Sequence, residues 1–293
     1  LVHSDNYRNW VFSSSHPTQG RRFDNGRALI VEQCQQRGIS FQEVAPRVAT
    51  RAELESVHSP AHVSRVIDEA KSGEWAGARV DLAELAATFV GGTLVALDHL
   101  QQGDTLLAVN LPGAKHHAQF DRSSGFCVFA DLVIAAKTLT STGKRVAIFD
   151  FDAHHGDGTE NLSLSDPNIL TFSVHEKGIF PGTGNESDAA HLAFNHPLSA
   201  GSGNHQLAAA AVEFIELAHG FDPDYIFIAA GGDGHEADPL AHLEYTESGA
   251  GAAMRAVRQA FANTPILLGG AGGYRPDDAT PAMWCESVLG LVA

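Results

Sequence analysis

The chain has 293 residues, of which 44% are hydrophobic and 18% are charged, enough apolar material for one large α/β domain or two small ones. Its formal net charge of −16 argues against direct binding of nucleic acid, which requires a basic face. The charge favours a cationic binding partner, such as a lysine-rich segment or a polyamine, although ordinary solubility is the simpler explanation.

The cysteines and the N-terminal residues indicate the cellular compartment of the chain and the kind of metal ligands to expect. Cys34, Cys127 and Cys285 are odd in number, widely spread and without a CxxC pair, so we expect neither a disulfide framework nor a cysteine metal site. We find no signal peptide and no stretch near the roughly 20 apolar residues of a membrane span. These observations predict a cytoplasmic protein without a membrane contact, whose metal ligands are imidazoles and carboxylates.

Short β-rich segments alternate with helical ones, and no repeat, low-complexity tract or linker divides the chain. We therefore expect a single domain over residues 1–293. The alternation predicts the α/β class, with a central, mostly parallel sheet covered by helices on both faces in three layers. In chain order, the predicted elements are a strand at 106–110, a helix at 131–140, strands at 145–151, 169–174 and 225–230, a helix at 249–262 and a strand at 265–268.

Polar side chains cluster directly after four of the predicted strands. Ligands of open α/β sheets bind outside the carboxyl ends of the strands. Four such ends with reactive groups therefore suggest one shared site. The groups are His116 and His117 after the first strand, residues 150–157 after the second, Asp233 after 225–230 and Tyr274 after 265–268.

The run DFDAHHGDG at 150–158 is the most informative segment. Buried carboxylates are costly unless a metal or another cation neutralises them. Residues two apart share one face of a strand, so Asp150, Asp152 and His154 can point the same way. Two ligands from this strand end and one from elsewhere leave the open position that a catalytic zinc needs. Asp233, preceded by two glycines, is the expected third ligand, unless its segment is only a loop of Asx turns and caps.

The adjacent histidines His116 and His117 predict acid–base chemistry, although such a pair can also be a polar loop or part of a second metal site. Asp150 and Asp157 exceed the needs of a three-ligand zinc site. A carboxylate behind an imidazole fixes its tautomer and raises its basicity. We therefore expect two His–Asp dyads, one of which takes a proton from the attacking water and returns it to a leaving amine.

Tyr274 follows the glycine-rich run at 269–273. A phenol at this place can donate a hydrogen bond to a developing oxyanion. The alternative is a packing or capping tyrosine.

Four segments together resemble the histone deacetylase family, within the arginase/deacetylase fold, and are similar to its bacterial amidohydrolases. Their order and spacing match over roughly residues 100–285, and GGDGHEADPL at 231–240, HP at 16–17 and VHSPAHV at 57–63 support them. The four are PGAKHHA at 112–118 with GFCVFAD at 125–131, DFDAHHGDGTE at 150–160, SVHEKGIFPGTG at 173–184 and GGAGGY at 269–274.

The resemblance implies a role for each candidate residue. It implies zinc at Asp152, His154 and Asp233, with ferrous iron as an alternative for such a donor set. It implies that Asp150 backs His116, that Asp157 backs His117, and that Tyr274 is catalytic. The implied walls of an acyl-lysine tunnel are Gly125, Phe126, Phe180 and Gly272. The implied potassium site uses backbone oxygens of Asp150, Asp152, His154 and Val174 with the hydroxyl of Ser173.

Two positions depart from the family pattern. Lys115 precedes the histidine pair, where an aromatic residue or glycine is frequent, and Gly232 precedes Asp233, where phenylalanine or alanine is usual. Neither is an expected ligand. These departures therefore bear on substrate preference rather than on activity.

The functional hypothesis is zinc-dependent hydrolysis of an N-acetyl amide, with acetyl-lysine as the substrate. The alternative substrate is an acetylpolyamine or another small N-acetylated amine. A two-manganese ureohydrolase site would need further Asp and His ligands, which we do not find. A non-catalytic acyl-lysine binder is disfavoured because every expected ligand and the tyrosine are present. The oligomeric state is left open.

Overall fold

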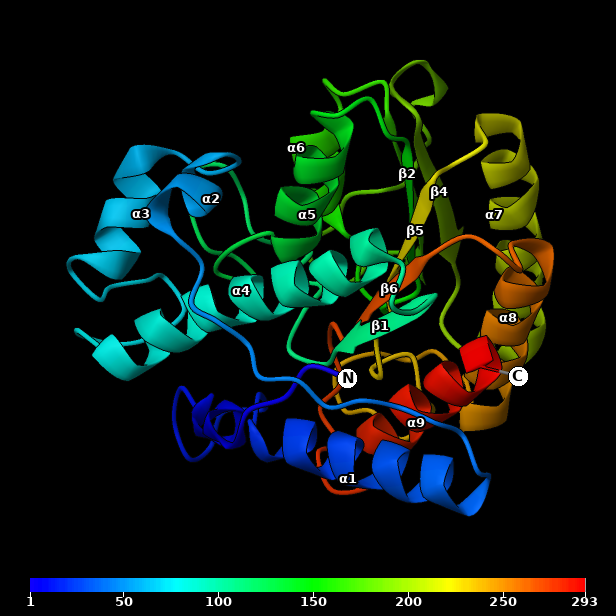
Figure 1. Cartoon of the computed structure of the whole chain (residues 1–293), viewed down its shortest axis with the longest axis horizontal. Helices are drawn as coiled ribbons and strands as arrows, with labels where there is room; N and C mark the ends of the chain where they lie inside the picture. The colour runs from blue at the N-terminus through cyan, green and yellow to red at the C-terminus, as the bar shows by residue number, and fades with distance from the viewer. Residues whose placement is uncertain (293) are drawn as a thin grey trace.

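Six strands form one sheet in the order β1-β6-β5-β2-β3-β4 in the computed structural model, which describes residues 1–292 (Figure 1). All five pairings are parallel, so the prediction of a mostly parallel sheet is confirmed and the sheet proves to be wholly parallel. The strands are β1 (Leu107–Asn110), β2 (Val146–Asp150), β3 (Ile169–Glu176), β4 (Ala193–Leu198), β5 (Tyr225–Ala229) and β6 (Ile266–Gly269).

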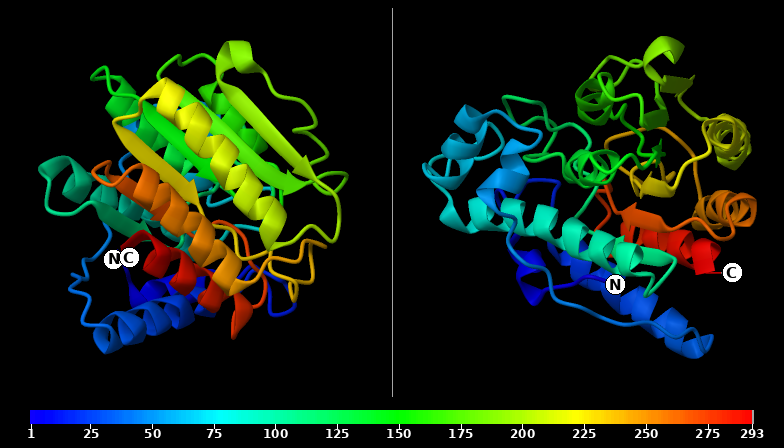
Figure 2. Two further views of the ribbon diagram at one scale, coloured as in Figure 1. Left: turned by 90° about the vertical axis from the view of Figure 1, so that its right-hand side faces the viewer. Right: turned by 45° about the horizontal axis from the view of Figure 1, so that its top comes forward.

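Helices cover both faces of the sheet, as the alternating sequence predicts. Helices α4, α5 and α6 lie on one face, while α7, α8 and α9 lie on the other and α1 packs against α9 (Figures 1 and 2). The helices are α1 (Arg21–Gln36), α2 (Arg51–Glu55), α3 (Pro60–Ile67), α4 (Val80–Gln102), α5 (Asp131–Thr140), α6 (Asp157–Ser163), α7 (Asn204–Phe221), α8 (Glu247–Ala260) and α9 (Ala279–Val292), with short 3-10 helices η1 (Asp5–Asn9) and η2 (Ala189–His191).

Helices bury the inner strands from both sides, and β2 and β5 are apolar at nearly every position, whereas β3 also buries four polar residues toward its carboxyl end. All five residues of β2 and all eight of β3 are buried. A strand covered on both faces reads as a continuous apolar run rather than as an alternating one. The carboxyl ends of β2 and β5 lie together because the two strands pair in register from Val146 to Asp150.

Helix α4 corrects one expectation. This 23-residue helix has a mean hydropathy of 1.6 over its most apolar window and is long and apolar enough to cross a membrane, so the sequence does contain such a stretch. Buried residues make up 72% of that window, because α4 is the core helix that packs on β1 and β6. Its small residues serve this packing: a Cβ at Gly92 would lie 2.8 Å from the hydroxyl of Tyr7.

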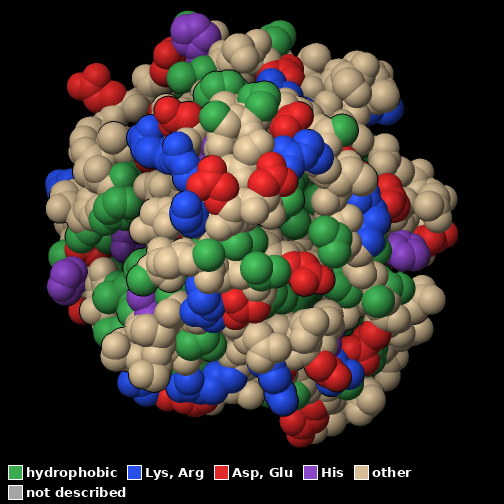
Figure 3. Space-filling model, turned by 90° about the vertical axis from the view of Figure 1, so that its left-hand side faces the viewer, with side chains coloured by type: hydrophobic (Ala, Val, Ile, Leu, Met, Phe, Trp, Pro, Cys, Tyr) green, Lys and Arg blue, Asp and Glu red, His purple; other side chains and the backbone are tan. Residues whose placement is uncertain are grey.

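Charged side chains of both signs are interspersed on the face that carries α2 and α3 (Figure 3). Many of them pair locally, as Arg51 does with Glu55 and Asp68, and Arg79 with Asp81. Such exposed pairs contribute little stability. They leave no extended basic patch in this view.

His58, in the connection between α2 and α3, joins two loops on the helical face. Its ring Nδ1 donates to the carbonyl of Gln119 at 2.8 Å, and Ala130 N–H donates to its Nε2 at 2.9 Å. These bonds require the neutral ring. Burial, with His62 nearby, lowers the pKa of His58 to about 4.

We predict that His58 makes the fold sensitive to acid. Its folded pKa lies below the unfolded value of about 6.5, so its contribution is complete above pH ~6.5 and is lost as the pH falls toward 4, up to about 3 kcal/mol. Urea unfolding across this range measures the loss. A His58→Asn variant should be less stable at pH 7 but should show a shallower pH slope. An equal slope in both proteins would contradict the assignment.

Candidate metal centre and active site

Asp152, His154 and Asp233 meet just beyond the ends of β2 and β5. Their potential ligand atoms all lie within 4.8 Å of one another, and all three residues are buried. The Nδ1 atom of His154 faces both carboxylates, 3.2 Å from Oδ1 of Asp152 and 3.0 Å from Oδ2 of Asp233. The structure thus brings together the three residues that the sequence nominates as metal ligands.

Backbone amides hold the two carboxylates in place. Ala153 N–H donates to Oδ1 of Asp233 at 2.9 Å, and Gly272 N–H donates to Oδ2 of Asp152 at 2.6 Å. Gly272 also has to lack a side chain, because a Cβ there would overlap the Oδ2 atoms of both aspartates. The glycine after β6 therefore shapes the centre from a third strand end.

The electrostatics of the triad fit a divalent cation. Burial and the charge of Asp152 raise the pKa of Asp233 to about 6. Burial opposes a charge on His154, but Asp152 and Asp233 outweigh it and raise its pKa to about 11. Two buried carboxylates that repel each other are neutralised by a dication, and two Asp and one His suit zinc or ferrous iron.

The histidine pair forms the two dyads expected from the sequence. His116 Nδ1 donates to Oδ2 of Asp150 and His117 Nδ1 donates to Oδ1 of Asp157, both at 2.7 Å. Each ring therefore turns its Nε2 away from its carboxylate, and that of His116 lies 3.7 Å from Oδ1 of Asp152. Gln119 donates to the second oxygen of Asp157 at 2.9 Å.

The pKa values of the two imidazoles are shifted in opposite directions. Burial opposes protonation of His116, but Asp150 and Asp152 raise its pKa to about 9. Burial and the neighbouring His116 lower the pKa of His117 to about 3, although Asp157 opposes this. These shifts favour the charged form of His116 and the neutral form of His117.

The loop after β1 carries the histidine pair from the sheet edge back to its centre. The carboxylate of Asp131, at the start of α5, accepts the N–H groups of Ala114 and Lys115 at 3.0 and 2.8 Å. Thr159 N–H donates to the carbonyl of His116 at 2.9 Å. These bonds fix the loop against both α5 and α6.

Aromatic rings surround the approach to this site. The ring of Phe180, half exposed at 50%, meets His117 edge-on at 5.0 Å between centroids, and the ring of Phe126 meets Tyr274 at 5.9 Å. Gly125 has a φ of +52°, and a Cβ there would overlap His117, so only glycine fits beside the imidazole. The predicted tunnel residues thus lie next to the histidine pair.

Tyr274 is held by its backbone rather than by its ring. Its N–H donates to Oδ2 of Asp238 at 2.7 Å. Burial and the charge of Asp233 raise the pKa of the phenol well above its usual value, so the hydroxyl remains a hydrogen-bond donor.

The residues of the expected potassium site lie at the ends of β2 and β3. Asp150 pairs with Ser173 in the parallel register, and the hydroxyl of Ser173 contacts Nδ1 of His175 at 3.0 Å. Asp150, Gly156 and Ser173 line a cavity of about 10 Å³. The potassium assignment, with Asp152, His154 and Val174, stays a prediction.

Several residues at the site escaped sequence reasoning. Asp238 lies within the segment 231–240, where its Asp-Pro pair is a weak turn signal. The others carry no signal of their own, because only the fold brings their elements to the site. They are Thr18, Arg22, Glu74, Gln119 and Cys127.

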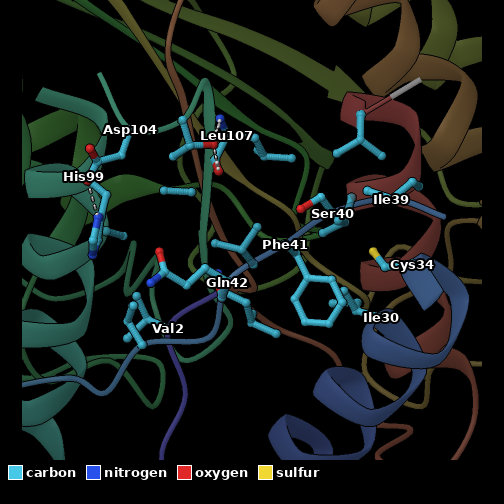
Figure 4. Close-up of a pocket in the computed structure, with 18 residues that line it drawn as sticks. Val2, Ile30, Cys34, Ile39, Ser40, Phe41, Gln42, His99, Asp104 and Leu107 are labelled. Carbon is cyan, nitrogen blue, oxygen red and sulfur yellow. Dashed lines mark hydrogen bonds and ion pairs between the residues drawn. The ribbon is translucent and has the colours of Figure 1, made fainter. Parts of the chain in front are cut away.

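A larger cavity lies away from this site, beside the edge strand β1. It has a volume of about 320 Å³, and aliphatic side chains dominate its wall. Figure 4 shows Cys34 and Ile30 of α1 on one side and the His99–Asp104 pair on the other, with Phe41 between them. No predicted site residue lines it.

A family model described as a histone deacetylase domain matches residues 16–291. This chain belongs to the histone deacetylase family. Among relatives, the acetoin utilization protein AcuC of Bacillus subtilis strain 168 is 32% identical over 315 residues, covering 98% of this chain and 80% of that protein. Histone deacetylase 8 of Xenopus laevis is 31% identical over 259 residues, covering 80% of this chain and 79% of that protein.

A solved structure agrees on the fold. The crystal structure of the HDA15 HD domain superposes with a TM-score of 0.84 at 23% identity and covers 100% of this chain and 90% of that chain. The resemblance to the histone deacetylase family that the sequence motifs suggest is therefore confirmed.

We predict that the triad binds one divalent metal per chain and that Gly272 is needed for it. Asp233→Asn removes a ligand charge, and Gly272→Ala pushes both aspartates aside, so each should lower zinc affinity at least tenfold. Elemental analysis and competition with a chelator measure this loss. An exposed control, Asp278→Asn, should bind zinc as the parent does. Parental zinc affinity in both site variants would place the metal elsewhere.

Proposed function

We propose that this chain is a zinc-dependent hydrolase that removes an acetyl group from a lysine side chain. The observation that carries the proposal is the Asp152–His154–Asp233 triad beside the histidine pair and Tyr274. Membership of the histone deacetylase family supports hydrolysis of an acyl amide. Ferrous iron is the alternative metal for the same donors.

The mechanism follows from the positions of the side chains. A bound zinc ion supplies Lewis acidity, which acidifies water and polarises the acyl carbonyl. The aliphatic stem of the substrate lies between Phe126 and Phe180, whose rings exclude water from it. The hydroxyl of Tyr274 donates to the acyl oxygen as negative charge develops there.

Proton transfer belongs to the histidine pair. Neutral His117, oriented by Asp157, takes a proton from the attacking water at Nε2 and gives it to the amine as the C–N bond breaks. His116 stays protonated against Asp150, and its positive charge favours the developing oxyanion. In this mechanism, His117 therefore acts as the general base and acid, and His116 stabilises the negative charge of the oxyanion.

We also propose a potassium ion near the metal centre. Backbone oxygens of Asp150, Asp152, His154 and Val174 and the hydroxyl of Ser173 would hold it. The support is the pairing of Asp150 with Ser173 and the small cavity between them. The ion would keep the end of β2 in the conformation that presents the ligands.

An acetylpolyamine or another small N-acetylated amine is the second candidate substrate. The net charge of −16 favours either cationic substrate. Hydrolysis of an acetyl-lysine peptide and of N-acetylated polyamines, each with and without zinc, distinguishes the two. We propose no direct contact with nucleic acid or membrane and a cytoplasmic site of action, for which the three free, buried cysteines are the support.

We predict that His117→Ala and Tyr274→Phe keep zinc but lose turnover. Each removes a group that acts on the reacting atoms but leaves all three ligands in place, so kcat should fall roughly 10²–10⁴-fold. Zinc content and hydrolysis of an acetyl-lysine peptide are measured together. His191→Ala, on an exposed histidine paired with Asp188, should change neither. A parental rate in either site variant would refute its role.

A further inference from the structure

The cavity beside the histidine pair has two basic side chains in its wall. It has a volume of about 20 Å³, and Gly125 and Phe126 line it together with Thr18, Arg22 and Lys115. The last three residues are only 1%, 2% and 6% exposed. A guanidinium and a lysine amine are therefore buried in the same cavity as the histidine pair.

Lys115 has no anionic partner among residues 1–292, and burial together with the charge of Arg22 lowers the pKa of its ammonium to about 8. Its ammonium lies over the rings of Phe89 and Phe23, at 5.4 and 5.9 Å from their centroids, and no ion pair or side-chain hydrogen bond reaches it. The nearby carboxylate of Asp131 is already occupied by two backbone amides and the hydroxyl of Thr93. The aromatic faces stabilise the cation only in part.

Arg22 and Thr18 add unsatisfied donors to the wall of the same cavity. Arg22 donates one N–H to the carbonyl of Gly273, but its Nε has no partner within the described part of the chain. The hydroxyl of Thr18 is likewise buried without one. Buried donors of this kind are normally satisfied, so the cavity is built for a polar or anionic group.

The reaction directs the acyl group toward these donors. With the amide oxygen at Tyr274 and the amine stem passing Phe126 and Phe180, the acyl substituent points inward, to Lys115. We infer that Lys115 sets the acyl preference: it favours acyl groups with a compact polar or anionic inner end and disfavours branched or longer aliphatic ones. This inference rests on the proposed hydrolysis.

Solvation of the ammonium explains the selection. The cavity has room for roughly one or two water molecules. An acetyl methyl can leave a water on Lys115. A larger aliphatic group removes that water and leaves the ammonium desolvated without compensation. A carboxylate replaces the water and pairs with Lys115 and Arg22.

The test compares two acyl groups of the same shape. Peptides carrying Nε-malonyl-lysine or Nε-isovaleryl-lysine are assayed with zinc, and an acetyl-lysine peptide is the reference. The parent should have at least tenfold higher kcat/KM for malonyl than for isovaleryl. Lys115→Met, similar in volume but uncharged, should shift that ratio at least tenfold toward isovaleryl. Lys115→Arg should keep the parental preference.

Control variants separate the effect of removing the Lys115 charge from an effect on folding. Lys177→Met, at an exposed lysine, should leave the ratio unchanged. If Lys115→Met does not fold, Thr18→Val removes one donor and should lower malonyl hydrolysis severalfold relative to acetyl. The inference is overturned if the parent prefers isovaleryl, or if folded Lys115→Met keeps the parental ratio of kcat/KM for malonyl over isovaleryl. In either case, hydrolysis of the acetyl-lysine peptide would still support the proposed function. No hydrolysis of any peptide overturns both.

Discussion

The repulsion between two buried carboxylates organises this site. Asp152 and Asp233 follow adjacent strands and face each other with water excluded, which is unfavourable for two anions without a positive charge between them. The surrounding backbone amides, the imidazole of His154 and the side-chain-free Gly272 all serve to hold this pair. The arrangement therefore favours a positive charge between the two carboxylates, and a bound divalent metal would supply it.

The order of the strands makes this arrangement possible. The chain runs outward from β2 to β3 and β4, and then returns to β5 on the other side of β2. The connection after β2 leads toward β3 and the connection after β5 leads toward β6 on the opposite side. In open α/β sheets, ligands bind where neighbouring connections part in this way. The first strand lies at the far edge, and its long following loop has to cross the ends of β6 and β5 to deliver the histidine pair.

Much of this was predictable because burial leaves a simple mark on sequence. The strands β2, β5 and β6 are mostly apolar, and α5 was predicted with the bounds that the structure shows. β4 was missed because Asn195, His196 and Pro197 interrupt its apolar pattern at a sheet edge. The polar groups at strand ends could be assigned to one site since parallel strands end together.

Contacts made by loops, such as that of Asp238 with Tyr274, depend on turns that a single sequence does not specify. The long apolar stretch of α4 was not recognised in the sequence because its glycines, alanines and threonines do not form an unbroken run of large apolar residues.

Helix α4 has a consequence for synthesis of the chain. The ribosome completes this helix before its main partners β1 and α5, and a further partner, β6, is among the last elements to emerge. Until then, one side of a long apolar helix has only part of its final cover, a state in which chains aggregate or engage chaperones. A helix that is largely buried in the finished domain is therefore at risk of aggregation while the chain is being synthesised.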